Sequence, residues 1–404
     1  MIFSGNSGIN ISETIDSQYV STAVNSFDEG INVSNQHIIS ASSSSELEIN
    51  QQFEAAGKNP NPNPIFSNAA IVADFNGDGK TDKFWRNNTT GETAIWLMDG
   101  GNVLLTESLP SLDFAWSYSI ADFNRDGRSD LFWRNNTTGE NVIWLMDGTR
   151  IISNVGLQNI DSNWSYNIVD FNGDGRSDIF WRNNTTGENA TWLINNTTVT
   201  TAAFLSQQDL NWTPSIVDFD GDSKSDVFWR NNTTGENKVW FMNGTNLSEY
   251  SLLNFDSGWD SSVGDFNGDS RTDILWRNGE TGENSIWLMN GVFSIGSSVE
   301  KRDSSWKQSV GDFNGDGKTD IFWHNETTGE NTAWMMNGFS LERAAFLPAT
   351  TPSAKPDIGD FNGDGKTDIF WRNSETGDTN LWLMNDTTAT ETALPQLSSE
   401  WVAY

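Results

Sequence analysis

The chain has 404 residues, and its 23 Lys and Arg against 55 Asp and Glu give a net charge of −32, which excludes nucleic acid and anionic membranes as default partners because both would be repelled. It has no Cys and only two His, which excludes disulfides, thiolate metal sites and most His-dependent catalysis. Its 20 Trp and 24 Phe supply enough apolar surface for a folded core.

Residues 1–65 differ in composition from the rest of the chain. They contain the run ASSSS at 41–45 and alternating Asn and Pro at 59–64, a pattern typical of an extended spacer. We interpret 1–65 as a low-complexity tail and linker. The N-terminus has no basic segment followed by an apolar one, and no stretch approaches 18 apolar residues, so we expect neither a standard secretion signal nor a membrane span.

Residues 66–404 repeat with a period of 47 to 48 residues. The clearest marker is a nine-residue acidic segment, which begins at Asp74, Asp122, Asp170, Asp218, Asp265, Asp312 and Asp360. Seven copies of this length are typical of propeller blades. We therefore predict an all-β fold, a seven-bladed β-propeller of four-stranded antiparallel blades, closed into a ring because a single blade cannot bury both of its faces.

The second copy illustrates the strands expected in each blade. Its predicted strands are 116–123, 130–135, 140–146 and 150–157. The acidic segment separates the first two strands, a hairpin loop at 136–139 separates the next two, and an Asp-Gly turn at 147–148 leads into the fourth. The last residues, 401–404, stand where an eighth copy would begin, so we expect them to fold back to the seam near Asn68 and close the ring.

All 20 Trp residues fall into three columns of the repeat. The second-strand column is Trp85, Trp133, Trp181, Trp229, Trp276, Trp323 and Trp371, and the third-strand column is Trp96, Trp144, Trp192, Trp240, Trp287, Trp334 and Trp382. A four-residue hairpin loop would place Trp85 opposite Ala94 and diagonal to Trp96, with both indoles on one sheet face. These two columns are therefore expected to pack between blades rather than to bind a ligand.

The third Trp column allows two interpretations. It consists of Trp116, Trp164, Trp212, Trp259 and Trp306, with Trp401 at the C-terminus, and it lies where a connection between blades enters the inner strand. A core role and a ligand-binding role are both consistent with this position, because aromatic faces stack on sugar rings. Five similar grooves would give weak sites a multivalent gain, so we keep the first five residues as candidate ligand contacts.

Each acidic segment places oxygen-bearing side chains at positions 1, 3, 5 and 9, and position 7 can add a main-chain carbonyl. The candidate metal ligands are Asp74, Asn76, Asp78, Lys80 and Asp82; Asp122, Asn124, Asp126, Arg128 and Asp130; Asp170, Asn172, Asp174, Arg176 and Asp178; Asp218, Asp220, Asp222, Lys224 and Asp226; Asp265, Asn267, Asp269, Arg271 and Asp273; Asp312, Asn314, Asp316, Lys318 and Asp320; and Asp360, Asn362, Asp364, Lys366 and Asp368. Hard oxygen ligands without His or Cys favour Ca²⁺, up to seven ions in all. For one isolated copy, an Asx-rich turn explains the residues equally well; seven copies in register favour calcium.

The seven acidic segments are not identical. Gly at position 6 permits a sharp bend, but Ser223 and Ser270 replace it in the fourth and fifth copies. Arg125 replaces the usual Gly at position 4 of the second copy. We therefore expect the weakest calcium binding at 218–226 and 265–273.

The segments DFNGDGKTD and DFNGDGRSD resemble the calcium loops of FG-GAP/VCBS repeats, which build the seven-bladed propellers of integrin α subunits and certain fungal and bacterial lectin-like propellers. The resemblance covers residues 68–404. It implies that each loop joins the first two strands of a blade, that the metal is structural, and that partners bind in grooves between blades or on the opposite rim. The residues that give the family its name are not reproduced, so integrin-type ligand recognition does not transfer.

The leading functional hypothesis is a calcium-binding, non-catalytic recognition module for carbohydrate, at the cell surface or outside the cell. The alternatives are a protein-binding scaffold and, third, a polysaccharide-active enzyme. No His paired with a nucleophile and no phosphate-binding Gly motif supports catalysis. The expected partner is a glycan or protein, without nucleic acid or membrane insertion. The extracellular location follows from calcium availability and the resemblance, while the missing standard signal leaves the export route open.

Overall fold

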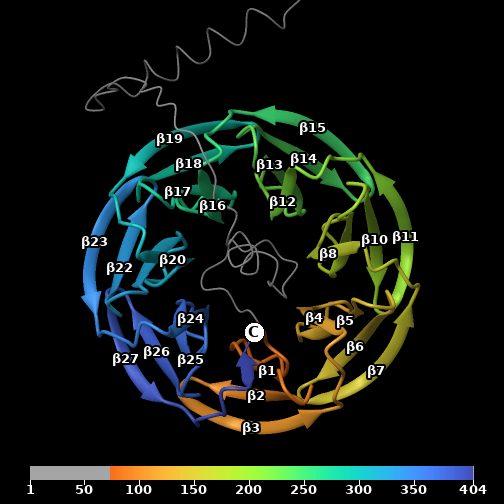
Figure 1. Cartoon of the computed structure of the whole chain (residues 1–404), viewed down its shortest axis with the longest axis horizontal. Coiled ribbons are helices and arrows are strands. Elements are labelled where there is room, and N and C mark those ends of the chain that lie inside the picture. The colour runs from red at the N-terminus through yellow and green to blue at the C-terminus, as the bar shows by residue number, and fades with distance from the viewer. Residues whose placement is uncertain (1–72, 404) are drawn as a thin grey trace, which may run out of the picture. The chain divides into compact units, whose positions relative to one another are not determined.

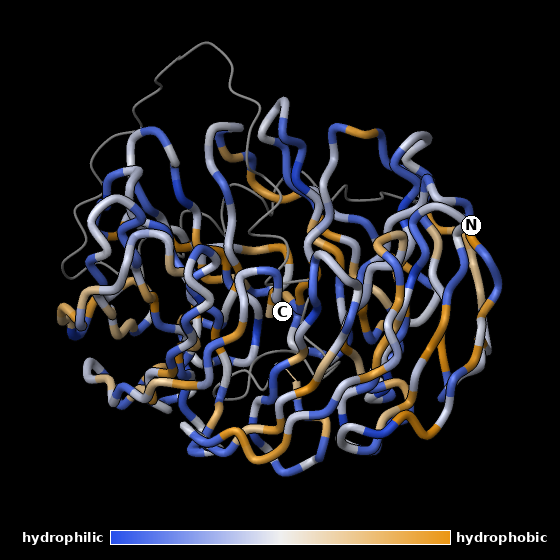
Figure 2. Tube along the Cα trace, turned by 60° about the horizontal axis from the view of Figure 1, so that its bottom comes forward, coloured by the Kyte–Doolittle hydropathy of each residue, from blue (hydrophilic) through white to orange (hydrophobic). Residues whose placement is uncertain are grey.

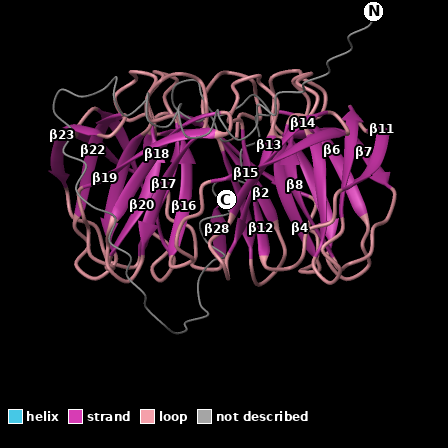
Figure 3. Cartoon of the chain, turned by 90° about the horizontal axis from the view of Figure 1, so that it is seen from above, coloured by secondary structure: helices cyan, strands magenta, loops and turns pink. Residues whose placement is uncertain are grey.

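The computed structural model describes residues 73–403, which form a seven-bladed β-propeller. Each blade is a sheet of four antiparallel strands, and the blades follow one another around a ring, with the first strand of each nearest the centre (Figure 1). The side view in Figure 3 shows strands joined by loops at two rims, with no helix in the described part of the chain. The predicted fold is confirmed. The tail and linker predicted for 1–65 lie outside the described residues.

The first two blades contain β28 (Trp401–Ala403), β1 (Lys83–Asn87), β2 (Thr93–Asp99) and β3 (Asn102–Leu109), and then β4 (Trp116–Ala121), β5 (Asp130–Asn135), β6 (Asn141–Asp147) and β7 (Arg150–Leu157). The third and fourth contain β8 (Trp164–Val169), β9 (Asp178–Asn183), β10 (Asn189–Asn195) and β11 (Thr198–Leu205), and then β12 (Trp212–Val217), β13 (Asp226–Asn231), β14 (Asn237–Asn243) and β15 (Asn246–Leu252).

The fifth blade contains β16 (Trp259–Gly264), β17 (Asp273–Asn278), β18 (Asn284–Asn290) and β19 (Phe293–Val299). The last two contain β20 (Trp306–Gly311), β21 (Asp320–Asn325), β22 (Asn331–Asn337) and β23 (Ser340–Leu347), and then β24 (Ala354–Gly359), β25 (Asp368–Asn373), β26 (Thr379–Asn385) and β27 (Thr388–Ala393).

The hydrophobic core lies between neighbouring blades. Hydrophobic residues recur among hydrophilic ones along the strands (Figure 2). Phe84 in β1 contacts Tyr118 and Trp133 of the next blade, with ring centroids 4.4 and 6.1 Å away. Each blade therefore buries its faces against its neighbours, as expected of a sheet with two apolar faces.

The second-strand and third-strand Trp columns form the centre of this core. In the first blade, Trp85 is paired with Ala94, and Lys83, two residues earlier on β1, is paired with Trp96, which is the predicted register. The ring centroids of Trp85 and Trp96 lie 4.8 Å apart. In the other six blades, the ring centroids of the equivalent Trp pair lie 4.9–5.4 Å apart. All fourteen indoles are buried. The prediction that these columns pack between blades is confirmed.

A second contact between blades uses the Arg that follows six of the seven second-strand Trp residues. Arg134 Nη2 donates to the Asp161 carbonyl at 2.7 Å, in the connection to the next blade, and its guanidinium lies 4.9 Å from the ring of Trp181. The other members are Arg86, Arg182, Arg230, Arg277 and Arg372, each on the Trp of the following blade, with Arg372 on Trp85. These six Arg clamps link consecutive blades by charge-assisted hydrogen bonds and cation–π contact.

The clamp is weaker at the junction of the sixth and seventh blades. His324 replaces Arg there; it is 1% exposed, and its ring lies 5.2 Å from that of Trp371. Its Nδ1 bonds the Asn331 Oδ1, while its buried Nε2 has no partner among the described residues. This junction therefore lacks the carbonyl bonds that Arg makes elsewhere.

The C-terminal strand closes the ring. β28 pairs with β1 through Trp401 opposite Asn87 and Ala403 opposite Trp85, so the end of the chain completes the first blade (Figure 1). The predicted closure is confirmed, although Asn68 itself lies outside the described residues. Lys83 adds an ion pair across this seam: it is buried on β1 and contacts Asp357 on β24 of the seventh blade.

We expect His324→Arg to stabilise the propeller by about 1–2 kcal/mol, because it restores charge-assisted bonds to the next connection. The matched control, Arg277→His, removes such a clamp and should destabilise by a similar amount. Apparent melting temperatures at one fixed scan rate compare the three proteins. A lower melting temperature for His324→Arg, with Arg277→His unchanged, would contradict this account of the clamps.

Deletion of 401–404 should lower the melting temperature more than any single clamp mutation, because it leaves β1 as an open inner edge and removes ring closure. A control that replaces Val402 by Ala keeps the strand pairing. Scanning calorimetry measures both variants. Equal melting temperatures for the deletion and the full chain would show that closure does not depend on β28.

Candidate metal centres and the opposite rim

In the second to seventh blades, the acidic segment forms the loop between the inner strand and the second strand. In the first blade, the segment 74–82 leads into the second strand, β1, and the inner strand is β28. The turn between the third and fourth strands lies beside it, since Gly148 N donates to the Phe75 carbonyl of the preceding loop at 2.8 Å. We call this edge of the ring the loop rim. The hairpins between second and third strands, the connections between blades and the third Trp column form the opposite edge, the tryptophan rim.

The loop curls around the carboxylate at position 1. In the first loop, Asp74 Oδ1 accepts from Gly77 N at 2.6 Å, and its Oδ2 accepts from Gly79 N at 2.8 Å. Asn76 Oδ1 accepts from Asp78 N at 2.9 Å. These bonds require left-handed backbone at positions 4 and 6, where φ is +76° and +80°. The loop thereby brings the side chains of positions 1, 3 and 5 together.

The Asp at position 9 is tied more deeply into the blade. Asp82 Oδ2 accepts from Phe75 N, and its Oδ1 accepts from Met98 N in the third strand, both at 2.8 Å. The third-strand bond recurs in all seven blades, at Met98, Met146, Ile194, Met242, Met289, Met336 and Met384. Position 9 is therefore a structural acceptor, and in the first loop it also interacts electrostatically with the acids at positions 1 and 5, Asp74 and Asp78.

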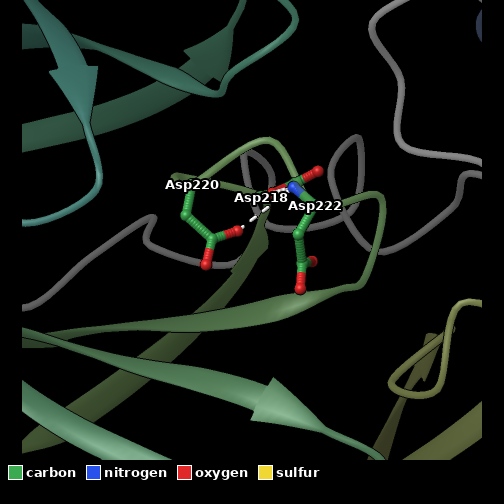
Figure 4. A group of neighbouring side chains, drawn as sticks. All are labelled: Asp218, Asp220 and Asp222. Atoms are coloured by element: carbon green, nitrogen blue, oxygen red, sulfur yellow. Dashed lines mark hydrogen bonds between the residues drawn. The ribbon is translucent and has the colours of Figure 1, made fainter.

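The fourth loop gathers three carboxylates. Asp218, Asp220 and Asp222 each offer an oxygen within 4.8 Å of the others, the one group of three acidic or His side chains with this spacing in the described chain (Figure 4). The other loops have Asn at position 3. Ser223 holds position 6 at φ +66°, and a non-Gly residue there costs about 1 kcal/mol. The third carboxylate favours calcium binding at this loop, whereas the backbone strain at Ser223 disfavours the loop conformation. The weak calcium binding expected at 218–226 therefore stays a prediction.

Burial gives the loop acids a high affinity for a positive charge. Burial raises the pKa of Asp82 and Asp368 to about 7, of Asp130, Asp178, Asp273 and Asp320 to about 8, and of Asp226 to about 9. Burial also raises the pKa of Asp170 and Asp218, at position 1, to about 6. The groups with a pKa of about 8 or 9 stay mainly protonated near neutral pH unless a cation is bound. The oxygen donors and the flexible loop suit Ca²⁺.

Neighbouring loops are hydrogen-bonded to each other around the whole ring. Ser129 N, at position 8 of the second loop, donates to the Asp74 carbonyl at 2.6 Å, and Asp74 N donates to the Ser129 hydroxyl at 2.9 Å. The main-chain bond recurs at every junction, donated by Ser177, Ser225, Thr272, Thr319 and Thr367, and by Thr81 to Asp360 across the seam. Ordering one loop therefore orders part of the next.

This role of position 8 was missed in the sequence, although the signal was present: the residue is Ser or Thr in all seven copies. The side chain at position 7 also reaches the preceding loop. Arg128 Nε donates to the Asn76 carbonyl at 3.3 Å, and its stem covers Gly77. The structure thus places the position 7 side chain against the neighbouring blade.

The FG-GAP-like repeat family profile matches residues 74–133, 122–181, 170–229, 218–276, 265–323 and 312–371. The chain belongs to this family. No curated protein sequence matches the chain. Each matched stretch runs from one acidic loop to the second-strand Trp of the following copy, so the family unit includes the loop-to-loop contact described above.

Solved structures of similar fold include binding proteins and enzymes. A lectin of Agrocybe aegerita, described as recognising non-reducing terminal N-acetylglucosamine, has a TM-score of 0.65 at 14% identity, over 81% of this chain and 95% of the lectin. A post-proline cleaving enzyme of Rickettsia typhi has a TM-score of 0.50 at 11% identity, over 80% of this chain and 53% of the enzyme. At sequence identities of 14% and 11%, these similarities concern the fold alone.

The tryptophan rim holds the candidate ligand residues of this FG-GAP-like propeller. Trp116, Trp164, Trp212 and Trp259 are half-buried, whereas Trp306 is 6% exposed. Their surroundings differ: Trp164 lies 6.3 Å from the exposed ring of Phe204, and Trp212 lies 4.1 Å below the Lys238 ammonium. The five positions are therefore equivalent in the backbone but not in chemistry.

The metal-free protein is expected to be less stable at pH 8 than at pH 5. An acid whose folded pKa is raised holds its proton more tightly when folded, so its stabilising effect is complete below about pH 4 and is lost as pH rises through about 7 to 9. Calcium should reverse this trend, because it binds the ionised form. Melting temperatures after chelation, with and without added Ca²⁺, measure both effects. A metal-free melting temperature that rises over this range would contradict the assignment.

Proposed function

We propose that this protein is a calcium-stabilised recognition module that binds carbohydrate at the tryptophan rim, at the cell surface or outside the cell. The observation that carries the proposal is that the candidate metal ligands and the candidate sugar-binding indoles lie on opposite rims of the ring. Oxygen donors gather on the loop rim, while half-buried indoles stand around the opposite rim. Metal binding can thus hold the ring without occupying the ligand surface.

Calcium is supported by the donor set and by charge. Seven Ca²⁺ ions would add 14 positive charges and change the net charge from −32 to −18. The loops place three or four acidic or amide groups together, and burial raises the pKa of their acids. Calcium would replace the protons that these acids otherwise hold, and would couple metal uptake to folding.

Carbohydrate is supported by the half-buried indoles and by their repetition. Sugar rings present C–H faces that stack on aromatic rings, and Trp is the richest such surface among side chains. The fold similarity to a lectin agrees with this function but does not identify a sugar. Several weak sites around one ring would bind a dense glycan surface by multivalency.

A protein-binding scaffold is the second candidate, because large apolar side chains are exposed on outermost strands. Phe204, Phe293 and Phe346 are 76%, 72% and 68% exposed on β11, β19 and β23. Phe293 lies beside the turn between the third and fourth strands of its blade, near the loop rim, whereas Phe204 lies 6.3 Å from Trp164 on the tryptophan rim. A protein partner bound at Phe293 would therefore use a different surface from the proposed glycan sites.

A glycan array probed in calcium and again in EDTA tests the proposal. We expect binding in calcium, at least tenfold weaker binding in EDTA, and a similar loss when Trp116, Trp164 and Trp259 are together replaced by Ala. Phe293→Ala, on the outer wall, is the control and should bind as the unmodified protein does. No bound glycan in calcium would reject carbohydrate, and an effect of Phe293→Ala alone would favour the scaffold.

A further inference from the structure

One connection between blades differs from the other six in charge. Residues 300–305, between β19 and β20, contain Lys301 and Arg302, whereas the other described connections contain no Lys or Arg. Arg302 N donates to the Gly282 carbonyl at 2.9 Å, and its equivalents, which make the same bond, are Leu112, Ile160, Gln208, Phe255, Thr350 and Leu397. Arg302 therefore puts a cation where every other copy has a neutral side chain.

The Arg302 guanidinium lies on the tryptophan rim above two indoles. Its Cζ is 4.9 Å from the ring of Trp306 and 4.8 Å from that of Trp334. Trp306 is buried beneath it, in contrast to the half-buried Trp116, Trp164 and Trp259. This position thus presents a half-buried cation above the indole, whereas the positions of Trp116, Trp164 and Trp259 present a half-buried aromatic ring.

No carboxylate neutralises Arg302 directly. No ion pair of Arg302 lies within residues 73–403, and its Nε is buried without a hydrogen-bond partner there. The adjacent Asp303 is exposed, and its carboxylate accepts from the Ser305 N–H at 3.0 Å. The hydrogen bonds from Ser305 and, after them, the charges of Arg277 and Arg302 lower the pKa of Asp303, but its carboxylate forms no ion pair with Arg302. Exposed Lys301 and Lys307 flank the site, and Asp260 lies near Lys307. In a chain of charge −32, an Arg without a carboxylate partner has donors to offer an external anion.

The fourth blade provides an internal comparison. Lys238 also lies over a third-column indole, 4.1 Å from Trp212, but it lies 3.6 Å from Glu249 Oε2 and also contacts Gln208. Trp240 Nε1 donates to the same Glu249 oxygen at 2.6 Å. This cation is satisfied within the protein, whereas Arg302 is not.

We propose that the groove at Arg302 and Trp306 binds the anionic group of an acidic saccharide, a carboxylate or a sulfate ester. The guanidinium presents paired N–H donors that match the geometry of either group, and the indoles below fix its plane. The inference rests on the proposed carbohydrate function and makes one of its five grooves selective for charge. A purely structural Arg302 would only cover Trp334 with its aliphatic stem, comparable to Leu112, which packs against the hydrophobic cluster that includes Trp144.

The test compares Arg302→Leu, which restores the residue of the equivalent position 112, with the unmodified protein. The probes are oligosaccharides that carry galacturonate, glucuronate, sialic acid or sulfate, each with its neutral parent, at fixed calcium and salt. Lys238→Gln is the matched control, because it removes a cation on the same rim that already has a carboxylate partner, Glu249. Leu112→Arg is the converse variant, which introduces a cation into the groove at Trp116. Melting temperatures establish that each variant is folded.

We expect acidic probes to bind the unmodified protein better than their neutral parents, and Arg302→Leu to weaken the acidic probes about tenfold without changing the neutral ones. Lys238→Gln should leave this preference intact, and Leu112→Arg should increase it. Carboxylate and sulfate probes then identify which anion is bound. Equal binding of acidic probes by the unmodified protein and Arg302→Leu would overturn the inference while leaving the carbohydrate function intact. Absence of binding to every probe would reject the carbohydrate function itself.

Discussion

Burial of both faces of every blade is the constraint on which this structure depends. A four-stranded sheet with Trp on its faces exposes that surface unless another blade covers each side. The paired indoles, such as Trp133 and Trp144 at 5.2 Å, belong to one blade, and the Phe84 ring of the preceding blade lies 6.1 Å from Trp133. No blade is complete alone, so the ring must close, and the closing strand β28 comes from the opposite end of the described chain.

Strand direction divides the molecule into two rims with different chemistry. Because antiparallel strands alternate in direction, the first and third links within a blade fall on one rim, and the second link and the connection to the next blade fall on the other. The acidic loops thus gather on one side of the ring and the third Trp column on the other. The loops bond one another around the ring through residues such as Ser129 and Asp74, so the loop rim is a continuous hydrogen-bonded circle.

The informative positions are those that break the repeat. His324 interrupts the six Arg clamps, Lys83 replaces an apolar residue to pair with Asp357 across the seam, and Arg302 places an unpaired cation on the tryptophan rim. Lys83 is buried, whereas the Asp357 side chain is 39% exposed. The pair contributes little net stability, but it disfavours closure in any other register, because a buried Lys83 without its partner would be costly. The uniform copies build the ring, and the exceptions distinguish one blade from another.

The sequence alone determined the fold, the register within a blade and the ring closure, because each follows from local signals that recur seven times: the 47–48-residue period, the turn residues and the Trp columns. It also located the acidic loops. It did not reveal the Arg clamps, the loop-to-loop bonds of Ser129 and its equivalents, or the cation over Trp306, since each joins residues of different blades. Contacts between blades depend on how far each sheet rotates around the ring. Only the closed tertiary structure sets that rotation, and so only it decided which of the repeated side chains meet.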